Sequence, residues 1–359
     1  MSSSLPETLR RSMALADLPR SASPLPGIGG QVKAAPEDFV VEEIPAFPPS
    51  GSGDFLYLWI QKTDWDTRAL LRMLGERLGI ETGDVGTAGV KDRRAITRQT
   101  ISVPSHCHDR LGALEDVEGF EVLRVDRHGH KLRTGKLRGN RFSILLREPS
   151  GTLEAAESIA AHVRQGLPNF YGEQRFGREG STAELGWDFL RGEKTSRTRR
   201  AGRNRFLRRM AISAVQSALF NDYLLRRIAV NQHREVLAGD RMARRDSGGP
   251  FRADDVATEQ SRFEAGETVM TGPIFGSRVL RAEGDAFELE QKVLDEAGIQ
   301  TDDFGRFKKL ALGTRRPLLI WPEQLEVTAV EAGIRVDFSL PPGSYATVVM
   351  REFQGEGDR

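Results

Sequence analysis

One carboxylate stands among several cations in the stretch AGVKDRRAITRQTISV, residues 88–103. Asp92 follows Lys91 and precedes two arginines, and no second carboxylate, histidine or cysteine lies close by in the sequence. Positive neighbours favour the charged form of a carboxylate and lower its pKa. Such an aspartate suits a nucleophile or an electrostatic stabiliser better than a general acid. An exposed ion pair of little energetic consequence explains the same pattern.

Other reactive motifs are weak. The segment GHKLRTGKL, residues 129–137, has one residue too many between its glycines for a phosphate loop, and Leu137 stands where that loop needs Ser or Thr. The segment SHCHD, residues 105–109, offers too few convergent ligands for zinc and is expected to be a polar turn. We therefore expect neither a nucleotide cofactor nor a metal.

The composition is that of a globular protein without membrane segments. Of the 359 residues, 38% are hydrophobic and 29% are charged, and the apolar runs are too short to cross a bilayer. The one cysteine, Cys107, fits a reducing compartment and predicts a cytoplasmic protein. Residues 1–30 are rich in Pro and Ser, lack a signal-peptide pattern, and are expected to form a mobile lead-in.

The net charge of +1 conceals two basic segments. The segment 191–209 holds nine basic residues against Glu193, and 124–141 holds seven against Asp126. Either segment alone is compatible with solvated surface charge, but two arginine-rich segments favour a polyanion-binding face. Arg199, Arg200 and Arg203 are the residues that we expect to contact a nucleic-acid backbone.

Hydrophobic periodicity predicts an α+β fold with a mixed, mainly antiparallel sheet flanked by helices. Expected strands cover 38–44, 55–62, 100–103, 119–125, 141–147 and 334–340, and helices follow Asp66 or Thr67 and Thr152. From Gly166 the sequence becomes largely helical, with a long helix at 210–230. We therefore expect a core of residues 31–165 and 320–359 that is interrupted by a mainly helical domain, 166–319.

Aromatic residues beside polar sequence add a second chemical signal. Phe39, Phe142 and Tyr345 offer faces on which unpaired bases stack, and the amide of Asn140 is suited to reading a base edge. Phe39 and Phe142 are equally compatible with ordinary core strand positions. Together with the basic segments, they favour an enzyme that acts on a base of RNA.

Residues 88–99 resemble the signature of the TruD family of tRNA pseudouridine synthases, Ala-Gly-x-Lys-Asp-x-x-Ala-x-Thr-x-Gln, at every fixed position. The resemblance extends in family order from about Lys33 to Phe353. It includes the segments APEDFVVEE, HKLRTGKLRGNRF, LPNFYGEQRFG, SALFN and LPPGSYAT.

The resemblance implies a pseudouridine synthase core with an inserted TruD-type domain, and an enzyme that isomerises a uridine of tRNA, at position 13, without a cofactor. It implies that Asp92 is catalytic and that the uridine pocket is lined by Phe39, Asn140, Phe142 and Tyr345, with Lys33 nearby. The family usually has Phe where this chain has Tyr345, and the order of Phe170 and Tyr171 is reversed.

Two other functions are compatible with parts of the sequence. A non-catalytic RNA-binding module on the same fold needs the basic segments and aromatic residues but has no use for Asp92. A metal-dependent nuclease needs several convergent carboxylates, and the sequence around Asp92 supplies one. The expected partner is tRNA, and nothing in the sequence indicates a membrane or a protein partner.

Overall fold

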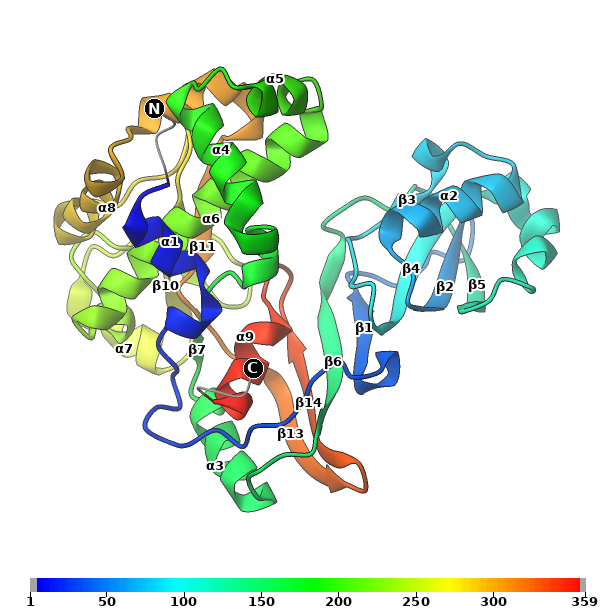
Figure 1. Cartoon of the computed structure of the whole chain (residues 1–359), viewed down its shortest axis with the longest axis horizontal. Coiled ribbons are helices and arrows are strands. Elements are labelled where there is room, and N and C mark those ends of the chain that lie inside the picture. The colour runs from blue at the N-terminus through cyan, green and yellow to red at the C-terminus, as the bar shows by residue number, and fades with distance from the viewer. Residues whose placement is uncertain (1–4, 356–359) are drawn as a thin grey trace. The chain divides into compact units, whose positions relative to one another are not determined.

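The computed structural model describes residues 5–355, which divide into two compact units (Figure 1). The sheet unit consists of Pro24–Gln165, Trp321–Ala346 and residues 352–355. The helical unit consists of residues 5–23, Gly166–Ile320 and Thr347–Arg351. Within residues 5–355, no helix has the length and apolar character needed to cross a membrane.

An eight-stranded sheet dominates the sheet unit. Its order is β13 (Glu323–Val330), β14 (Gly333–Leu340), β6 (Leu137–Arg147), β1 (Phe39–Pro45), β4 (Ile96–Pro104), β2 (Phe55–Thr63) and β5 (Phe120–His128), and β3 (Gly86–Thr87) pairs with β4. The β1–β4 pair is parallel and the other pairs are antiparallel. The predicted α+β class with a mixed, mainly antiparallel sheet is confirmed.

Strand alternation places one apolar row of β2 under helix α2 (Thr67–Leu78), which lies over β2 and β4 in Figure 1. Leu56 and Leu58 pack there against Leu70 and Leu74. The helix begins where the Asp66 side chain accepts hydrogen bonds from two backbone N–H groups, and it ends before Gly79 in the left-handed conformation. The 3₁₀ helix Ser105–Leu114, which contains the SHCHD segment, buries Cys107 in the same core.

The other helix lying wholly in the sheet unit, α3 (Leu153–Arg164), packs on β13. The Thr152 hydroxyl caps its first turn, and Gly166 follows its last turn with a φ of 100°. Short 3₁₀ helices cover Pro36–Asp38 and Thr82–Asp84. The closing segment forms α9 (Ala346–Gln354), whose residues belong to both units.

Helices make up most of the helical unit. They are α1 (Glu7–Met13), α4 (Ser181–Arg191), α5 (Ser196–Gly202), α6 (Arg205–Ala229), α7 (Val256–Glu264) and α8 (Gly284–Ala297). Short 3₁₀ helices cover Leu15–Asp17, Glu173–Arg175, Arg178–Gly180, Gln232–Arg234 and Thr301–Leu310. The middle of α6 is buried on nearly all sides, because its sequence is apolar or small around the whole helix.

The helical unit also contains a four-stranded sheet that the sequence pattern did not predict. Its order is β11 (Thr314–Pro317), β10 (Thr268–Ile274), β8 (Arg241–Arg244) and β9 (Pro250–Arg252), and β7 (Leu167–Pro168) pairs separately with β12 (Leu319–Ile320). Every residue of β10 is buried. A strand that is buried on both faces shows no alternation of polar and apolar residues, so its pattern is not distinctive.

The N-terminal segment differs from the predicted mobile lead-in. Leu9 of α1 is fully buried, and the Ser12 hydroxyl donates to the carbonyl oxygen of Ala218 on α6 at 3.0 Å. The Asn221 amide of α6 donates in turn to the Ser12 carbonyl oxygen at 2.8 Å. Leu5, Leu9 and Met13 form an apolar stripe at helical spacing that the Pro- and Ser-rich composition obscures. Residues 1–4 lie outside the described part.

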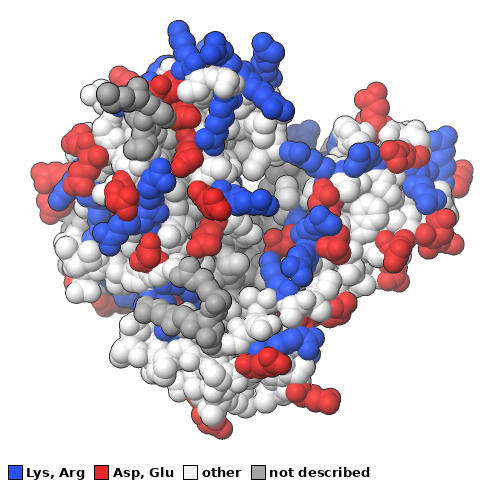
Figure 2. Space-filling view, viewed as in Figure 1, with Lys and Arg blue, Asp and Glu red and all other residues white. Residues whose placement is uncertain are grey.

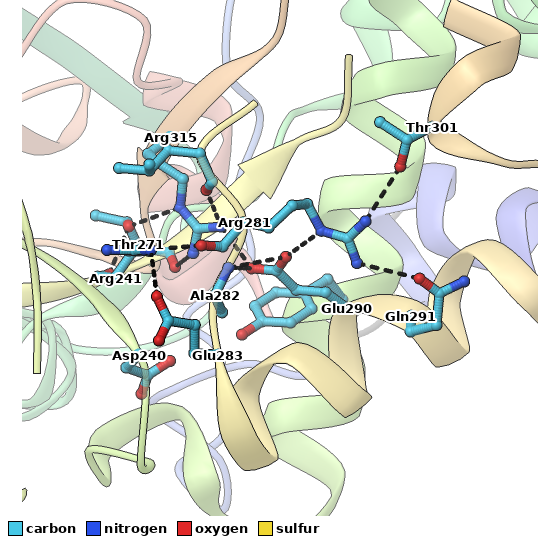
Figure 3. Close-up of polar contacts among 12 residues, drawn as sticks. Asp240, Arg241, Thr271, Arg281, Ala282, Glu283, Glu290, Gln291, Thr301 and Arg315 are labelled. Atoms are coloured by element: carbon cyan, nitrogen blue, oxygen red, sulfur yellow. Dashed lines mark hydrogen bonds and ion pairs between the residues drawn. The ribbon is translucent and has the colours of Figure 1, made fainter. Parts of the chain in front are cut away.

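A buried polar network holds α8 to the four-stranded sheet (Figure 3). Glu290 of α8 has no solvent exposure and pairs with the guanidinium groups of Arg281 and Arg315. Arg315 also donates to the Thr271 hydroxyl of β10 at 3.0 Å, and Arg281 donates to Thr301 at 3.1 Å. Charges buried in this way are tolerated because each one has partners.

Candidate active site

Asp92 lies in the loop between β3 and β4, and its side chain retains 34% of its solvent exposure. The backbone of this loop is held from below by Lys62, a fully buried residue of β2. The Lys62 ammonium donates to the carbonyl oxygens of Asp92 at 2.7 Å and Trp65 at 2.8 Å. The carboxylate is thus presented to solvent on a loop that is anchored in the sheet.

The Asp92 carboxylate pairs with a lysine that is remote in sequence. The Lys33 ammonium lies 3.5 Å from Asp92 Oδ2 and also 3.8 Å above the centre of the Phe39 ring. Lys33 has a φ of 59°, a left-handed conformation that is uncommon for a residue with a side chain. Backbone strain of this kind is concentrated at functional sites.

Three of the basic residues near Asp92 in the sequence make their closest contacts elsewhere. Arg93 pairs with Asp64 at 3.5 Å, and Arg98 pairs with Glu42 at 3.4 Å. The Lys91 ammonium points to Glu43 and Asn140. These residues therefore contribute positive charge to the region, while Lys33 makes the direct contact.

The segment that carries Lys33 and Phe39 is fixed by Asp38. This carboxylate is 1% exposed, accepts a hydrogen bond from the backbone N–H of Ala35 at 2.9 Å, and pairs with Arg147 of β6 at 2.7 Å. The hydrogen bond from Arg147 is the main cause that lowers the pKa of Asp38. Asp38 of the PEDF segment thus holds Lys33 and Phe39 in place but does not itself line the site.

Asn140 is oriented by a chain of buried charges. Asn140 lies opposite Glu43 in the β1–β6 pair, and Lys91 bridges them, with its ammonium 3.2 Å from Glu43 Oε2 and donating to Asn140 Oδ1. Because an ammonium only donates, the contacted atom is the amide oxygen, and the NH₂ group remains available as a donor. Gly139 allows this placement, since a Cβ there would lie 2.5 Å from the Leu340 carbonyl oxygen of β14.

The two phenylalanines expected in the pocket belong to a packed aromatic cluster. Phe39 is 2% exposed and Phe142 is 6% exposed. Their rings meet edge to face, with centroids 6.2 Å apart, and Phe142 stacks on Phe338 of β14 at 5.3 Å. Most of their surface is therefore buried against other residues. The two rings form an apolar wall beside Lys33 and do not expose a full ring face for stacking.

Burial changes the acidity of both lysines behind Asp92. It lowers the pKa of Lys62 from its ordinary 10.5 to about 8, although the Asp92 charge opposes the change. Burial also lowers the pKa of Lys91, and the nearby Glu43 carboxylate offsets part of the effect. Both lysines lie close to the Asp92 loop, Lys62 through its contact with the Asp92 carbonyl oxygen and Lys91 as the preceding residue.

The structure places Tyr345 and the three arginines but does not test their expected roles. Tyr345 is half-buried and immediately precedes α9, and its position beside a uridine stays a prediction. Arg199, Arg200 and Arg203 are exposed on α5 and just after it, where Figure 2 shows Lys and Arg side chains gathered. Their contact with RNA likewise stays a prediction.

Glu43, Lys62 and Phe338 belong to this site, and sequence reasoning did not select them. Glu43 and Lys62 each continue an inward-facing row of their strand: Glu43 follows Phe39 and Val41, and Lys62 follows Leu58 and Ile60. A charged residue at an inward position of an alternating strand is a usable signal, because an acid or lysine is rarely buried unless paired.

A half-exposed carboxylate that is paired with Lys33 thus lies beside an apolar aromatic wall on a mixed, mainly antiparallel sheet. The family model described as "tRNA pseudouridine synthase D (TruD)" matches residues 20–200 and 203–353. The chain belongs to the TruD family of tRNA pseudouridine synthases.

Relatives match the chain over nearly its full length. The tRNA pseudouridine synthase D of Anaeromyxobacter sp. (strain Fw109-5) is 43% identical over 96% of this chain and 97% of its own. That of a Thermus thermophilus strain is 38% identical over 91% and 89%. The crystal structure of the Methanosarcina mazei protein described as a putative tRNA pseudouridine synthase D has a TM-score of 0.73 and 26% identity, covering 98% of both chains.

Proposed function

We propose that this protein converts a uridine of tRNA to pseudouridine in the cytoplasm, with Asp92 as the catalytic residue and without a cofactor. The observation that carries the proposal is the half-exposed Asp92 carboxylate, paired with Lys33 and next to the Lys91–Asn140 contact, within the family signature. The names of the relatives support the reaction and the class of substrate.

The reaction is an isomerisation. The N1–C1′ glycosidic bond breaks, the uracil rotates, and a C5–C1′ bond forms. The hydrogen on C5 leaves as a proton, and N1 takes up a proton from solvent, so the overall composition does not change. The Asp92 carboxylate serves this sequence as a nucleophile at C1′ or C6, or by stabilising and deprotonating a glycal-like intermediate. All three routes need an ionised carboxylate, and the ammonium of Lys33 lies 3.5 Å from Asp92 Oδ2.

The neighbouring residues bind and orient the base. The target nucleotide has to leave its stack, which costs a few kcal/mol. The apolar wall of Phe39 and Phe142 packs against the uracil and offsets part of this cost. The NH₂ group of Asn140 donates to a uracil carbonyl oxygen, because Lys91 already occupies its amide oxygen.

The finer assignments follow from the resemblance. We assign the catalytic role to the sheet unit and backbone binding to the helical unit, through Arg199, Arg200 and Arg203. We place Tyr345 at the border of the uridine pocket, and we take position 13 of tRNA as the target. A non-catalytic RNA-binding module would have no use for the Asp92–Lys33 pair, which favours the enzyme.

Nucleoside analysis of a tRNA pool tests the proposal. Pooled tRNA lacking pseudouridine is incubated with the purified protein in buffer without any cofactor, digested to nucleosides and analysed by mass spectrometry and chromatography. We expect pseudouridine to appear, with an equal loss of uridine. Binding of the tRNA without any formation of pseudouridine would support the non-catalytic alternative.

A further inference from the structure

A pocket of about 310 Å³ opens in the sheet unit on the face of the sheet opposite to the α2 core. Leu56, Leu58 and Ile60 of β2 face α2, so the alternate residues Tyr57 and Trp59 face the other way and line the pocket. This volume is at the lower end for small-ligand sites, which suits one nucleotide rather than a duplex.

The wall of the pocket is aromatic. The Tyr57 ring lies 4.5 Å from that of His128, and Phe47, which also lines the pocket, stacks on His128 at 5.2 Å. Trp59 is half-buried and stacks on no aromatic ring within residues 5–355. An indole with a free face inside a pocket is a stacking surface for a base.

Two exposed cationic side chains without an ion-pair partner within residues 5–355 lie at the rim of the pocket. Lys136 and Arg138 are exposed and line the pocket, and no side-chain hydrogen bond or ion pair is recorded for either one in the described part of the chain. Arg124 also lines it but is paired with Asp126 at 2.7 Å. Aromatic residues inside and free cations outside match a nucleotide whose base enters and whose phosphates stay at the rim.

Glu43 connects this pocket with the Asp92 site. The parallel β1–β4 pairing ends at Glu42, and Glu43 is the next residue of β1. Glu43 lines the pocket together with Thr100, whose backbone N–H donates to Glu43 Oε1 at 3.3 Å. The other oxygen, Oε2, pairs with Lys91, which holds Asn140. One buried carboxylate is therefore shared by the wall of the pocket and the Asp92 site.

We propose that this pocket binds a second, unpaired nucleotide of the RNA substrate, with its base on Trp59 and its phosphates on Lys136 and Arg138. The proposal rests on the proposed function insofar as it takes RNA as the substrate. The nucleotide bound here is distinct from the target uridine and takes no part in the reaction.

Matched charge variants test the rim. The double variant Lys136→Gln/Arg138→Gln is compared with Arg72→Gln/Arg335→Gln, which removes the same charge from exposed positions of the sheet unit that neither line the pocket nor lie in the segment 124–141. We expect the slope of log affinity for tRNA against log salt to fall by about two in the pocket variant only. Equal effects of the two double variants would overturn the proposal.

Photo-crosslinking tests the base. Substrate tRNA carrying 4-thiouridine is irradiated with the wild-type protein, and the adducts are mapped by mass spectrometry. We expect an adduct in the peptide with Tyr57 and Trp59, and its loss together with about tenfold weaker binding in Trp59→Leu. Adducts confined to other peptides would overturn the proposal. Because crosslinking needs no turnover, an inactive protein that still gives this adduct would refute the proposed function alone.

A free nucleotide carries the same base and phosphate as RNA and is the alternative ligand for this pocket. Uridine 5′-monophosphate is titrated into the wild type and into Trp59→Phe, with tryptophan fluorescence as the readout. Quenching by the free nucleotide in the wild type only, combined with unchanged tRNA affinity in the Lys136/Arg138 variant, would assign the pocket to a small molecule and overturn the RNA assignment.

Discussion

Lys91 contacts both Glu43 and Asn140 and therefore links these two residues. Lys91→Met removes the donor that holds the Asn140 amide, so we expect turnover to fall by about a hundredfold, with tRNA affinity nearly unchanged. The variant also leaves Glu43 without its buried partner, which destabilises the fold.

The double variant Lys91→Met/Glu43→Gln separates these two effects. It removes both charges of the buried pair, so the free energy of unfolding should recover while turnover stays low. Thermal unfolding and single-turnover kinetics provide the two measurements, and Lys131→Met serves as a control on a lysine outside the site. Recovery of activity together with stability would show that Lys91 has only a structural role.

Lys62 gives the stability of the protein a characteristic dependence on pH. Its pKa is about 8 in the folded state and near 10.5 in the unfolded chain, so between these values the unfolded state binds more protons. Stability therefore rises with pH across this window, by up to about 3 kcal/mol in total. Below pH 8 both states are protonated, and the contribution no longer changes.

Denaturant unfolding of the RNA-free protein checks this expectation. The difference in unfolding free energy between the wild type and Lys62→Met should shift in favour of the wild type from pH 8 to 10, because the variant lacks the titrating group. A difference that stays constant over this range would show that Lys62 titrates normally.

At the residue scale, the sequence indicated candidate site residues but not the residues that contact them. Asp92 and Asn140 were selected from residue type and context, and the structure brings both to one end of the sheet unit. The role of Lys33 as the direct partner of Asp92 depends on a loop 59 residues away and on an uncommon φ, neither of which leaves a local pattern. Local charge therefore did not indicate which cation contacts Asp92 directly.

At the scale of elements, strands with one buried face and helices with capping residues were predictable. β1 alternates between buried and partly buried residues, and Asp66 and Thr152 cap α2 and α3 as expected. β10 was not predictable because it is buried throughout, and α1 was obscured by surrounding Pro and Ser. The pairing of β11, β10, β8 and β9 depends on contacts between distant segments, which periodicity does not encode.

Glu290 tests how α8 is attached to this four-stranded sheet. Glu290→Gln leaves the guanidinium groups of Arg281 and Arg315 without their shared carboxylate in a buried setting. We expect the free energy of unfolding to fall by about 3 kcal/mol or more. Glu288→Gln, on an exposed position of the same helix, should leave it nearly unchanged. Equal and small effects in denaturant unfolding would mean that the network does not stabilise α8.

At the scale of the whole molecule, a net charge near zero is compatible with RNA binding because the basic residues are segregated. The triple variant Arg199→Gln/Arg200→Gln/Arg203→Gln should weaken tRNA binding and reduce the salt slope by about three. A control with the same charge change, Arg72→Gln/Arg77→Gln/Arg335→Gln, alters exposed positions of the sheet unit outside both basic segments. Identical salt slopes for the two triple variants would assign the effect to net charge rather than to this segment.

The central claim is that the Asp92 carboxylate performs the chemistry, and the variant Asp92→Asn tests it most directly. The amide has nearly the same shape but neither the charge nor the nucleophilicity of the carboxylate. The measurement is the release of tritium from tRNA that carries 5-tritiated uridine, with tRNA affinity measured in parallel and Asp116→Asn as a control on an exposed aspartate. We predict no release above background with affinity retained, and appreciable release by Asp92→Asn would contradict the account.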